Sequence, residues 1–224
     1  MHLKDVAERV IQLEIQALSG LLDILDDEWE KAVQLIRNVP GRVILLGVGK
    51  SGHVGRKIAA TLASTGTPAF FVHAAEASHG DLGMITAADV VIAISNSGNT
   101  AEIISIVPAI LDLGAKLVAI TGNPTSRLAD SADVTLDIGV RQEADPLGLV
   151  PTSSTTATLA LGDAIAITVA VSRNFSREDF SRCHPGGSLG QLLASDKICV
   201  PAGLSDLQPI PDLQPISTPQ PIAS

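Results

Sequence analysis

The hexapeptide S-N-S-G-N-T at residues 95–100 brings three hydroxyl groups close together, on Ser95, Ser97 and Thr100. It follows an apolar run of strand length and precedes a helix-like segment, so free backbone N–H groups should face the same space as the hydroxyls. Hydroxyls and N–H groups at a helix N-terminus bind phosphate, and a glycine lets the backbone bend between them. We therefore expect a phosphate monoester to be held by Ser95, Asn96, Ser97, Gly98 and Thr100.

Ordinary helix capping is the alternative interpretation of this hexapeptide. Asn99 and Glu102 have the spacing of a capping box, which would explain one or two of these residues but not the alternating hydroxyls. An acid one turn past a phosphate site repels the ligand, although it stabilises an empty helix N-terminus. For Glu102, a site role and a capping role therefore both stay open.

A second glycine-rich turn, L-L-G-V-G-K-S-G at residues 45–52, could hold an anion in three ways. The P-loop pattern fails, because its first glycine would stand at the position of Ile44. The G-x-G-x-x-G dinucleotide pattern fits the glycines but lacks an acid at the end of the next strand, where the nearest candidate, Glu76, lies too far along. Two interpretations remain: a tight turn that binds the phosphate of another kind of ligand, and a tight turn that binds no phosphate.

Lys50 lies in this turn, between Gly49 and Ser51. The helix dipole disfavours a lysine at a helix start, so we expect Lys50 to stabilise charge on substrate oxygens rather than to be a solvated surface lysine. Ser51 should bind the substrate phosphate, and Gly49 should contact the substrate from the same turn.

Two titratable residues could move protons. Glu143 follows the last predicted strand in a long loop, where partial burial would raise its pKa and make it a general base. A solvated loop acid is the alternative. His184 precedes P-G-G, a turn that would fix its ring for proton transfer during sugar-ring opening, although a lone histidine is more often structural.

His73, His79 and Asp81 suggest a metal site, but their segment is short and no cysteine lies nearby. Proton transfer needs no Lewis acid, so we expect neither a required metal nor a cofactor. His79 is a candidate substrate contact and a possible inhibitory zinc ligand. The two cysteines, Cys183 and Cys199, give no disulfide framework.

Composition limits the fold and the partners. The chain has 224 residues, of which 46% are hydrophobic and only 2% aromatic, a mix suited to parallel strands covered by helices. Its formal net charge of −9 argues against nucleic acid as a binding partner. No secretory signal and no apolar run near the roughly 20 residues of a membrane span are evident, so we expect a cytoplasmic protein without membrane contact.

Alternating apolar runs and helix-like stretches predict a three-layer, doubly wound α/β domain over residues 1–195, with a five-stranded parallel sheet in flavodoxin-like order. Residues 3–38 should form N-terminal helices, the second from about Asp26 to before Pro40. Strands are expected at 42–48, 69–72, 89–95, 116–121 and 134–138, and helices at 53–64, 100–113, 125–131 and 153–172. Three proline-rich hexads at 206–223 predict that residues 196–224 form a disordered tail.

Several motifs in order resemble a known family. The two glycine turns are similar to those of sugar isomerase (SIS) domains. The match extends to H-A-A-E-A-S-H-G-D-L-G-M-I (73–85), E-A-D-P-L-G-L-V-P-T-S-S-T-T-A-T-L-A-L-G-D-A (143–164) and H-P-G-G-S-L-G (184–190). Over about residues 5–193 they resemble the arabinose-5-phosphate isomerases of 3-deoxy-D-manno-octulosonate synthesis. Many such relatives carry two CBS domains after the isomerase domain, where this sequence has the proline hexads. They also often have cysteine at the position of Asp145.

The resemblance implies a homotetramer that interconverts D-ribulose 5-phosphate and D-arabinose 5-phosphate through an enediol. It implies Lys50, Glu102, Glu143 and His184 as catalytic residues, with His184 supplied by a neighbouring subunit. Two other functions remain open: a non-catalytic sugar-phosphate sensor, which needs the phosphate site but not the acid–base residues, and an isomerase of another phosphosugar, such as a hexulose 6-phosphate.

Overall fold

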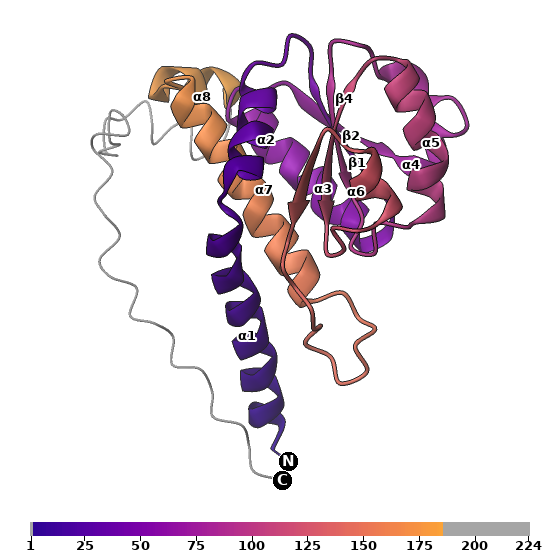
Figure 1. Cartoon of the computed structure of the whole chain (residues 1–224). Coiled ribbons are helices and arrows are strands. Elements are labelled where there is room, and N and C mark those ends of the chain that lie inside the picture. The colour runs from indigo at the N-terminus through magenta and orange to yellow at the C-terminus, as the bar shows by residue number, and fades with distance from the viewer. Residues whose placement is uncertain (1, 186–224) are drawn as a thin grey trace.

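The computed structural model describes residues 2–185 (Figure 1). The proline-rich hexads, and the predicted boundary between residues 195 and 196, lie outside the described residues. Within them, a central sheet is covered by helices on both faces, which confirms the predicted three-layer α/β architecture.

The sheet has five parallel strands in the order β2-β1-β3-β4-β5, the predicted flavodoxin-like order. The strands are β1 (Val43–Gly47), β2 (Ala69–His73), β3 (Val90–Ile94), β4 (Lys116–Thr121) and β5 (Val134–Asp137). Each predicted strand end is correct to within one residue, because β1, β3 and β4 are near-continuous apolar runs that the helices bury on both faces.

Two apolar clusters hold the layers together. On one face, α2 (Asp27–Arg37), α3 (Gly49–Ser64) and α7 (Ser153–Ser172) share a core with the sheet. On the other face lie α4 (Ala74–Ala77), α5 (Ala101–Asp112) and α6 (Arg127–Ser131). Alternate residues of a strand point to opposite faces, so Leu45 joins the first cluster and Leu46 the second.

The helix α7 is, among the described residues, the one long and apolar enough to span a bilayer by length and composition. Half of its most apolar window is buried inside the molecule, where Ile165, Ala166 and Val169 are fully covered. It therefore behaves as a core helix of the domain.

The helix α1 (Leu3–Gly20) lies along α7 and projects past the sheet, followed by the short helix η1 (Leu21–Ile24) (Figure 1). Within this single chain α1 buries no residue completely, and Leu3 and Ile11 are 90% and 58% exposed. A helix with this much uncovered apolar surface has the character of an interface.

Three short elements were not predicted: α4, η2 (Asp81–Met84) and α8 (Arg177–Cys183). They are too short to show an apolar period, and α8 is held at its start by a capping box between Ser176 and Asp179. The helix α3 also begins at Gly49, four residues before the predicted start at 53, because its glycines obscure the helical pattern.

Candidate active site

The predicted phosphate loop at residues 95–100 links β3 to α5 at the carboxyl edge of the sheet. Ser95 is 2% exposed, its hydroxyl lies 2.7 Å from that of Thr100, and it accepts a 3.1 Å hydrogen bond from the Gly98 amide. Gly98 has a φ of +63°, and a Cβ there would collide with the Ser126 side chain. Ser95 and Gly98 therefore shape the loop from the inside.

The outer side of the loop is open to a ligand. Asn96 and Ser97 are exposed, and Thr100 is half-buried. The helix α5 begins after Thr100 with no side-chain cap on its first amides, so those N–H groups face outward. This combination of exposed polar side chains and uncapped amides suits a phosphate group.

The capping-box alternative is wrong. Thr100, not Asn99, is the residue at the N-cap, and the Asn99 side chain instead donates to the Ser97 carbonyl at 3.1 Å and accepts from the Arg127 amide at 3.3 Å. Glu102 is only the second residue of α5 and is exposed. Its carboxylate is thus free of a capping role in the described residues.

The glycine-rich turn at residues 45–52 joins β1 to α3. It lies at the same edge of the sheet as the phosphate loop, since β1 and β3 are neighbouring parallel strands. Gly49 has a φ of +54°, whereas a Cβ on Gly47 would lie 3.2 Å from the Gly52 amide, so Gly47 and Gly52 serve close packing. Lys50 is exposed and forms no ion pair within residues 2–185, and Ser51 is half-buried beside it. An unpaired cation at a helix start favours the binding of an anion in this turn. Such an anion need not belong to a nucleotide.

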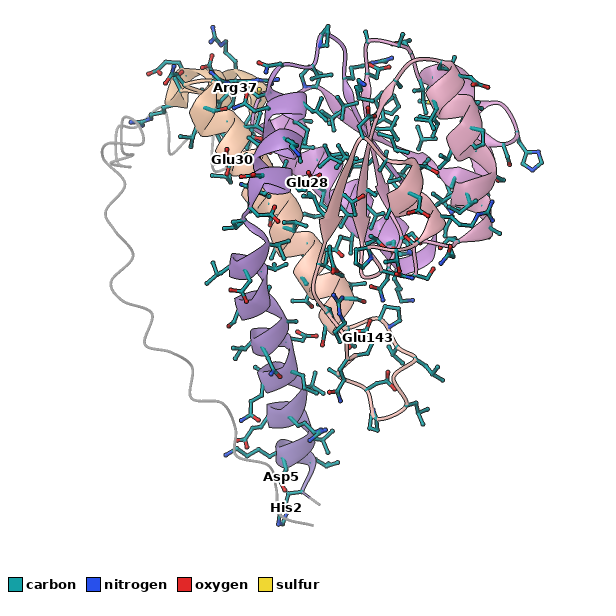
Figure 2. All side chains as sticks on the ribbon, in the orientation of Figure 1. His2, Asp5, Glu28, Glu30, Arg37 and Glu143 are labelled. Carbon is teal, nitrogen blue, oxygen red and sulfur yellow. The ribbon has the colours of Figure 1, made fainter. Side chains whose placement is uncertain are left out.

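Glu143 lies in the loop after β5, beside the start of α7 (Figure 2). Its Oε2 accepts from the Thr152 amide at 2.8 Å, the Thr152 hydroxyl at 3.0 Å and the Ser154 amide at 3.2 Å. Its Oε1 accepts a short hydrogen bond from the Ser154 hydroxyl. Glu143 therefore satisfies the otherwise unpaired amides at the N-terminus of α7.

The expected upward shift of the Glu143 pKa is wrong. Burial of the carboxyl raises its pKa, but the hydrogen bonds from Ser154 and Thr152 lower it more, so the pKa lies below the usual glutamate value. Glu143 is therefore ionised near neutral pH, which is the form that can accept a proton. Sequence inspection missed these two partners, although T-S-S-T nine residues after Glu143 is a run of helix-capping types.

Lys50, in the first turn of α3, and Glu143, which accepts hydrogen bonds from the start of α7, lie at the same end of the molecule. The helices α3 and α7 run in the same direction, because Lys57 pairs with Asp163 midway along them and Arg173 donates to the Thr67 hydroxyl at 2.9 Å just past their C-terminal ends. The carboxyl edge therefore brings together the glycine turn, the phosphate loop and Glu143, as expected for ligand binding in an open parallel sheet.

His184 lies elsewhere in the chain. It ends α8, where its Nδ1 is 2.9 Å from the Phe180 carbonyl and its ring stacks on that of Phe180. The helix α8 follows the C-terminus of α7, whose Arg173 donates to carbonyls at the end of α2, at the amino edge of the sheet. The loop before α7, which contains Glu143, and the helix α8, which His184 follows, thus lie at opposite ends of α7 (Figure 1).

Within the described residues, His73 and His79 do not belong to a group of side chains that could bind a metal. His79 is exposed after α4, and no group of three His, Cys, Asp or Glu side chains comes together anywhere in residues 2–185. His73 ends β2, and its buried Nδ1 has no hydrogen-bond partner among the described residues. The inhibitory zinc site at His79 therefore stays a prediction without support from the arrangement of side chains.

Asp145 organises the Glu143 loop. Its carboxylate accepts from the amides of Leu147, Leu149 and Val150 at 2.7–2.8 Å, which holds residues 145–150 in one conformation. A cavity of about 380 Å³ lies between this loop and Arg9 of α1. Aspartate at this position therefore gives the loop a defined shape.

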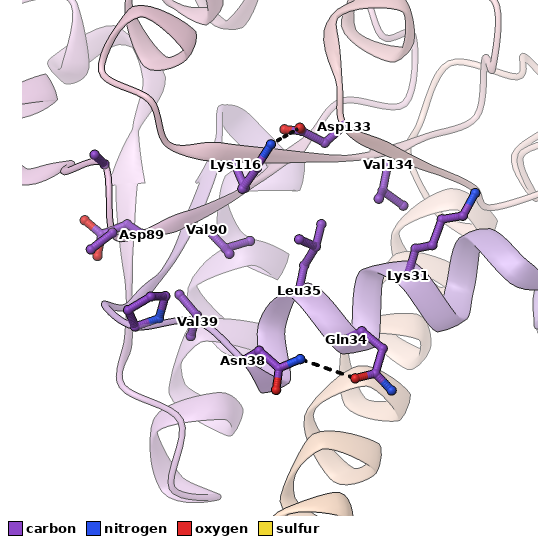
Figure 3. Close-up of a pocket in the computed structure, with 13 residues that line it drawn as sticks. Lys31, Gln34, Leu35, Asn38, Val39, Asp89, Val90, Lys116, Asp133 and Val134 are labelled. Carbon is purple, nitrogen blue, oxygen red and sulfur yellow. Dashed lines mark hydrogen bonds and ion pairs between the residues drawn. The ribbon is translucent and has the colours of Figure 1, made fainter.

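A larger cavity, of about 520 Å³, lies at the amino edge between α2 and the starts of β3, β4 and β5 (Figure 3). Leu35, Val39 and Val134 are among the apolar residues that line it, and the Lys116 ammonium is paired with Asp133 at 2.7 Å. None of the predicted site residues lines this cavity, and its charged groups already have partners. It is therefore not the candidate active site.

Comparisons with known proteins agree with the geometry. The family model of the SIS domain matches residues 35–168. The chain is 59% identical to an arabinose 5-phosphate isomerase KdsD of Pseudomonas aeruginosa, over 84% of this chain and 57% of the relative. It is 53% identical to the KdsD of Francisella tularensis, over 86% of this chain and 59% of that protein. The chain thus spans less than two-thirds of the length of these curated relatives.

A solved structure is similar over its full length. It is a protein of E. coli CFT073 in complex with arabinose 5-phosphate, with a TM-score of 0.79 and 43% identity over 83% of this chain and 100% of that one. The match of the family model to more than half of the chain, with the sheet order and the phosphate loop, leads to one conclusion: this chain belongs to the SIS-domain family.

Proposed function

We propose that this protein is an aldose–ketose isomerase that interconverts D-ribulose 5-phosphate and D-arabinose 5-phosphate without a cofactor. The observation that carries the proposal is the meeting of an open phosphate loop and an ionised, half-buried Glu143 at one edge of the sheet. The similarity to relatives named arabinose 5-phosphate isomerase, and to a solved structure in complex with arabinose 5-phosphate, supports this substrate.

In this proposal the phosphate is held by Ser97, Thr100 and the first amides of α5, which fixes the sugar over the carboxyl edge. Glu143 takes the proton from one of the two carbons, which gives an enediol, and returns it to the other. Lys50 stabilises negative charge on the enediol oxygens, and Glu102 contacts the sugar from the start of α5.

The proposal includes a homotetramer with shared active sites. The uncovered apolar residues of α1 support association of subunits, and the position of His184 at the far end of α7 from Glu143 supports its supply by a neighbouring chain. There, His184 would transfer a proton during ring opening. We place the enzyme in the cytoplasm, where its product would supply 3-deoxy-D-manno-octulosonate for lipopolysaccharide synthesis.

The test is to incubate the protein with a panel of pentose and hexose phosphates and to follow aldose–ketose interconversion by NMR. We expect interconversion of ribulose 5-phosphate and arabinose 5-phosphate, with deuterium entering the sugar in D₂O. Binding of sugar phosphates without any interconversion would indicate a sensor instead. Turnover of a hexulose 6-phosphate but not of pentose phosphates would indicate a different isomerase.

A further inference from the structure

The hydrogen bonds of Glu143 differ sharply between its two oxygens. Oε2 accepts from two backbone amides, of Thr152 and Ser154, and from the Thr152 hydroxyl. Oε1 accepts from one group, the hydroxyl of Ser154, whose residue is only 2% exposed. One oxygen is therefore saturated with donors, while the other retains a lone pair.

This difference decides where a proton can reside. Oε2 already accepts three hydrogen bonds, so a proton placed on it would displace at least one of these donors, and a backbone amide cannot accept instead of donating. A hydroxyl can rotate and accept instead of donating. A proton taken up by Glu143 is therefore accommodated at Oε1, where Ser154 can reverse its role, and opposed at Oε2.

We propose that Oε1 of Glu143 is the atom that takes and returns the substrate proton, and that Ser154 is the positioning residue that orients this atom and tunes its proton affinity. The inference rests on the proposed isomerase function. In it the Thr152 and Ser154 amides anchor Oε2, and the Ser154 hydroxyl donates to Oε1 before proton transfer and accepts from it afterwards. No proton is gained or lost by Ser154 in this exchange.

Few charged groups surround the Glu143 carboxylate. Arg9 of α1 and Asp145 of the same loop line the adjoining cavity, and Lys50 lies at the neighbouring start of α3. The start of α7 carries no acidic side chain in its first turn. How readily Glu143 gains a proton thus depends on burial, which raises its pKa, and on the hydrogen bonds from Ser154 and Thr152, which together lower it more, rather than on an ion pair.

The structure supplies a matched control in the adjacent residue. Ser153 is also buried in the first turn of α7, but its hydroxyl has no hydrogen-bond partner among the described residues. Ser153→Ala and Ser154→Ala are the same chemical change one residue apart in one helix. They differ in whether the lost hydroxyl contacts Glu143.

The test measures kcat and KM against pH for the wild type and both variants, and follows the Glu143 carboxyl carbon by ¹³C NMR titration without substrate. In Ser154→Ala we expect the acidic limb of kcat/KM and the NMR midpoint to move together to higher pH, because a donor to the ionised form is lost. Below that limb, activity should fall about tenfold relative to the wild type, the size expected for one such hydrogen bond. The KM of Ser154→Ala should remain close to the wild-type value. In Ser153→Ala, kcat, KM and the NMR midpoint should all remain close to the wild-type values.

A second pair of variants separates the loss of the hydroxyl from a general disturbance of the fold. Ser154→Thr and Ser154→Val have nearly the same shape, and only the threonine keeps the hydroxyl, so Ser154→Thr should titrate at lower pH than Ser154→Val. Equal midpoints in this pair, or an equal shift in Ser153→Ala, would overturn the role of Ser154. An inactive wild type would contradict the isomerase proposal instead, and the NMR midpoints would still decide whether Ser154 tunes Glu143.

Discussion

The two edges of the sheet differ in how many of their polar groups lack a partner within the described residues. At the amino edge, Asp89 accepts from the amides of Arg42 and Thr86 at 2.7 and 2.8 Å. Asp133 there accepts from the Leu117 amide at 2.8 Å and pairs with Lys116. At the carboxyl edge, Lys50 has no ion-pair partner in residues 2–185, and the amides that begin α5 have no side-chain cap.

This difference separates charges that stabilise the fold from groups that remain available to a ligand. A carboxylate that binds backbone amides of its own chain stabilises the fold and has little capacity left for a ligand. Unpaired donors at a helix N-terminus gain their partner only when an anion binds. Glu143 combines both patterns, because it caps α7 through Oε2 and keeps a lone pair on Oε1. The predictions below test this contrast, from the largest expected effect to the smallest.

Glu143→Gln should have the largest effect on activity. The amide keeps the size of the side chain but cannot accept the substrate proton, so we expect kcat to fall by about 10²–10⁴ with little change in KM. Deuterium exchange into the sugar should disappear with it. The control is Glu30→Gln on the exposed surface of α2, which should leave both constants unchanged. Exchange at the wild-type rate in Glu143→Gln would exclude this residue as the base.

Mixing two inactive variants should restore part of this lost activity. Glu143→Gln and His184→Asn, unfolded and refolded together, would form some sites that combine wild-type Glu143 of one chain with wild-type His184 of another. Activity should therefore return in the mixture and not in either variant treated alone. If mixed oligomers form without recovery, the two residues act within one chain.

Asp89→Ala should lower stability rather than activity. It leaves two amides and the Thr86 hydroxyl without their acceptor, so we expect a loss of about 3 kcal/mol in the free energy of unfolding, with normal turnover per folded molecule. Denaturant unfolding at pH 7 measures the loss, and Asp130→Ala on the exposed side of α6 is the control. A change in KM with unchanged stability would contradict the structural role of the amino edge.

The stability supplied by Asp89 should also depend on pH. Burial raises the pKa of Asp89, but the hydrogen bonds from Arg42 and Thr86 together lower it by more. The pKa in the folded protein therefore lies below the ordinary value of 3.8. A depressed carboxyl pKa contributes stability that is complete above 3.8 and is lost as pH falls through the folded pKa. The difference between wild type and Asp89→Ala should thus be constant near neutrality and shrink in acid.

Ser97→Ala should weaken substrate binding more than it slows turnover. The phosphate is remote from the reacting carbons, so its contacts act equally on the ground and transition states. One hydrogen bond to a charged group is worth about 1.5–3 kcal/mol, so KM should rise by about 10- to 100-fold. Ser105 lies in α5, just after the phosphate loop, and its hydroxyl donates to the Glu102 carbonyl, so the control Ser105→Ala should have no effect. Unchanged affinity for inorganic phosphate in Ser97→Ala would remove Ser97 from the site.

The sequence predicted the sheet better than the site. Apolar runs such as 116–121 define strands because parallel strands are buried on both faces, and the glycine turns follow them directly. The environment of Glu143 was not predictable, since its partners lie nine and eleven residues away and meet it only once α7 begins at Ser153. For the same reason, the predicted direction of the Glu143 pKa shift was wrong. The inward position of Ser95 likewise follows from tertiary packing.

The most direct measurement is an NMR titration of arabinose 5-phosphate into the ¹⁵N-labelled Glu143→Gln variant, in which turnover should be blocked. If the carboxyl edge is the site, amide shifts should appear at residues 49–51 and 96–102, while residues that line the amino-edge cavity, such as Gln34, Asn38 and Lys116, stay unchanged. Saturable shifts confined to the amino-edge cavity, with none at the carboxyl edge, would contradict the proposed site.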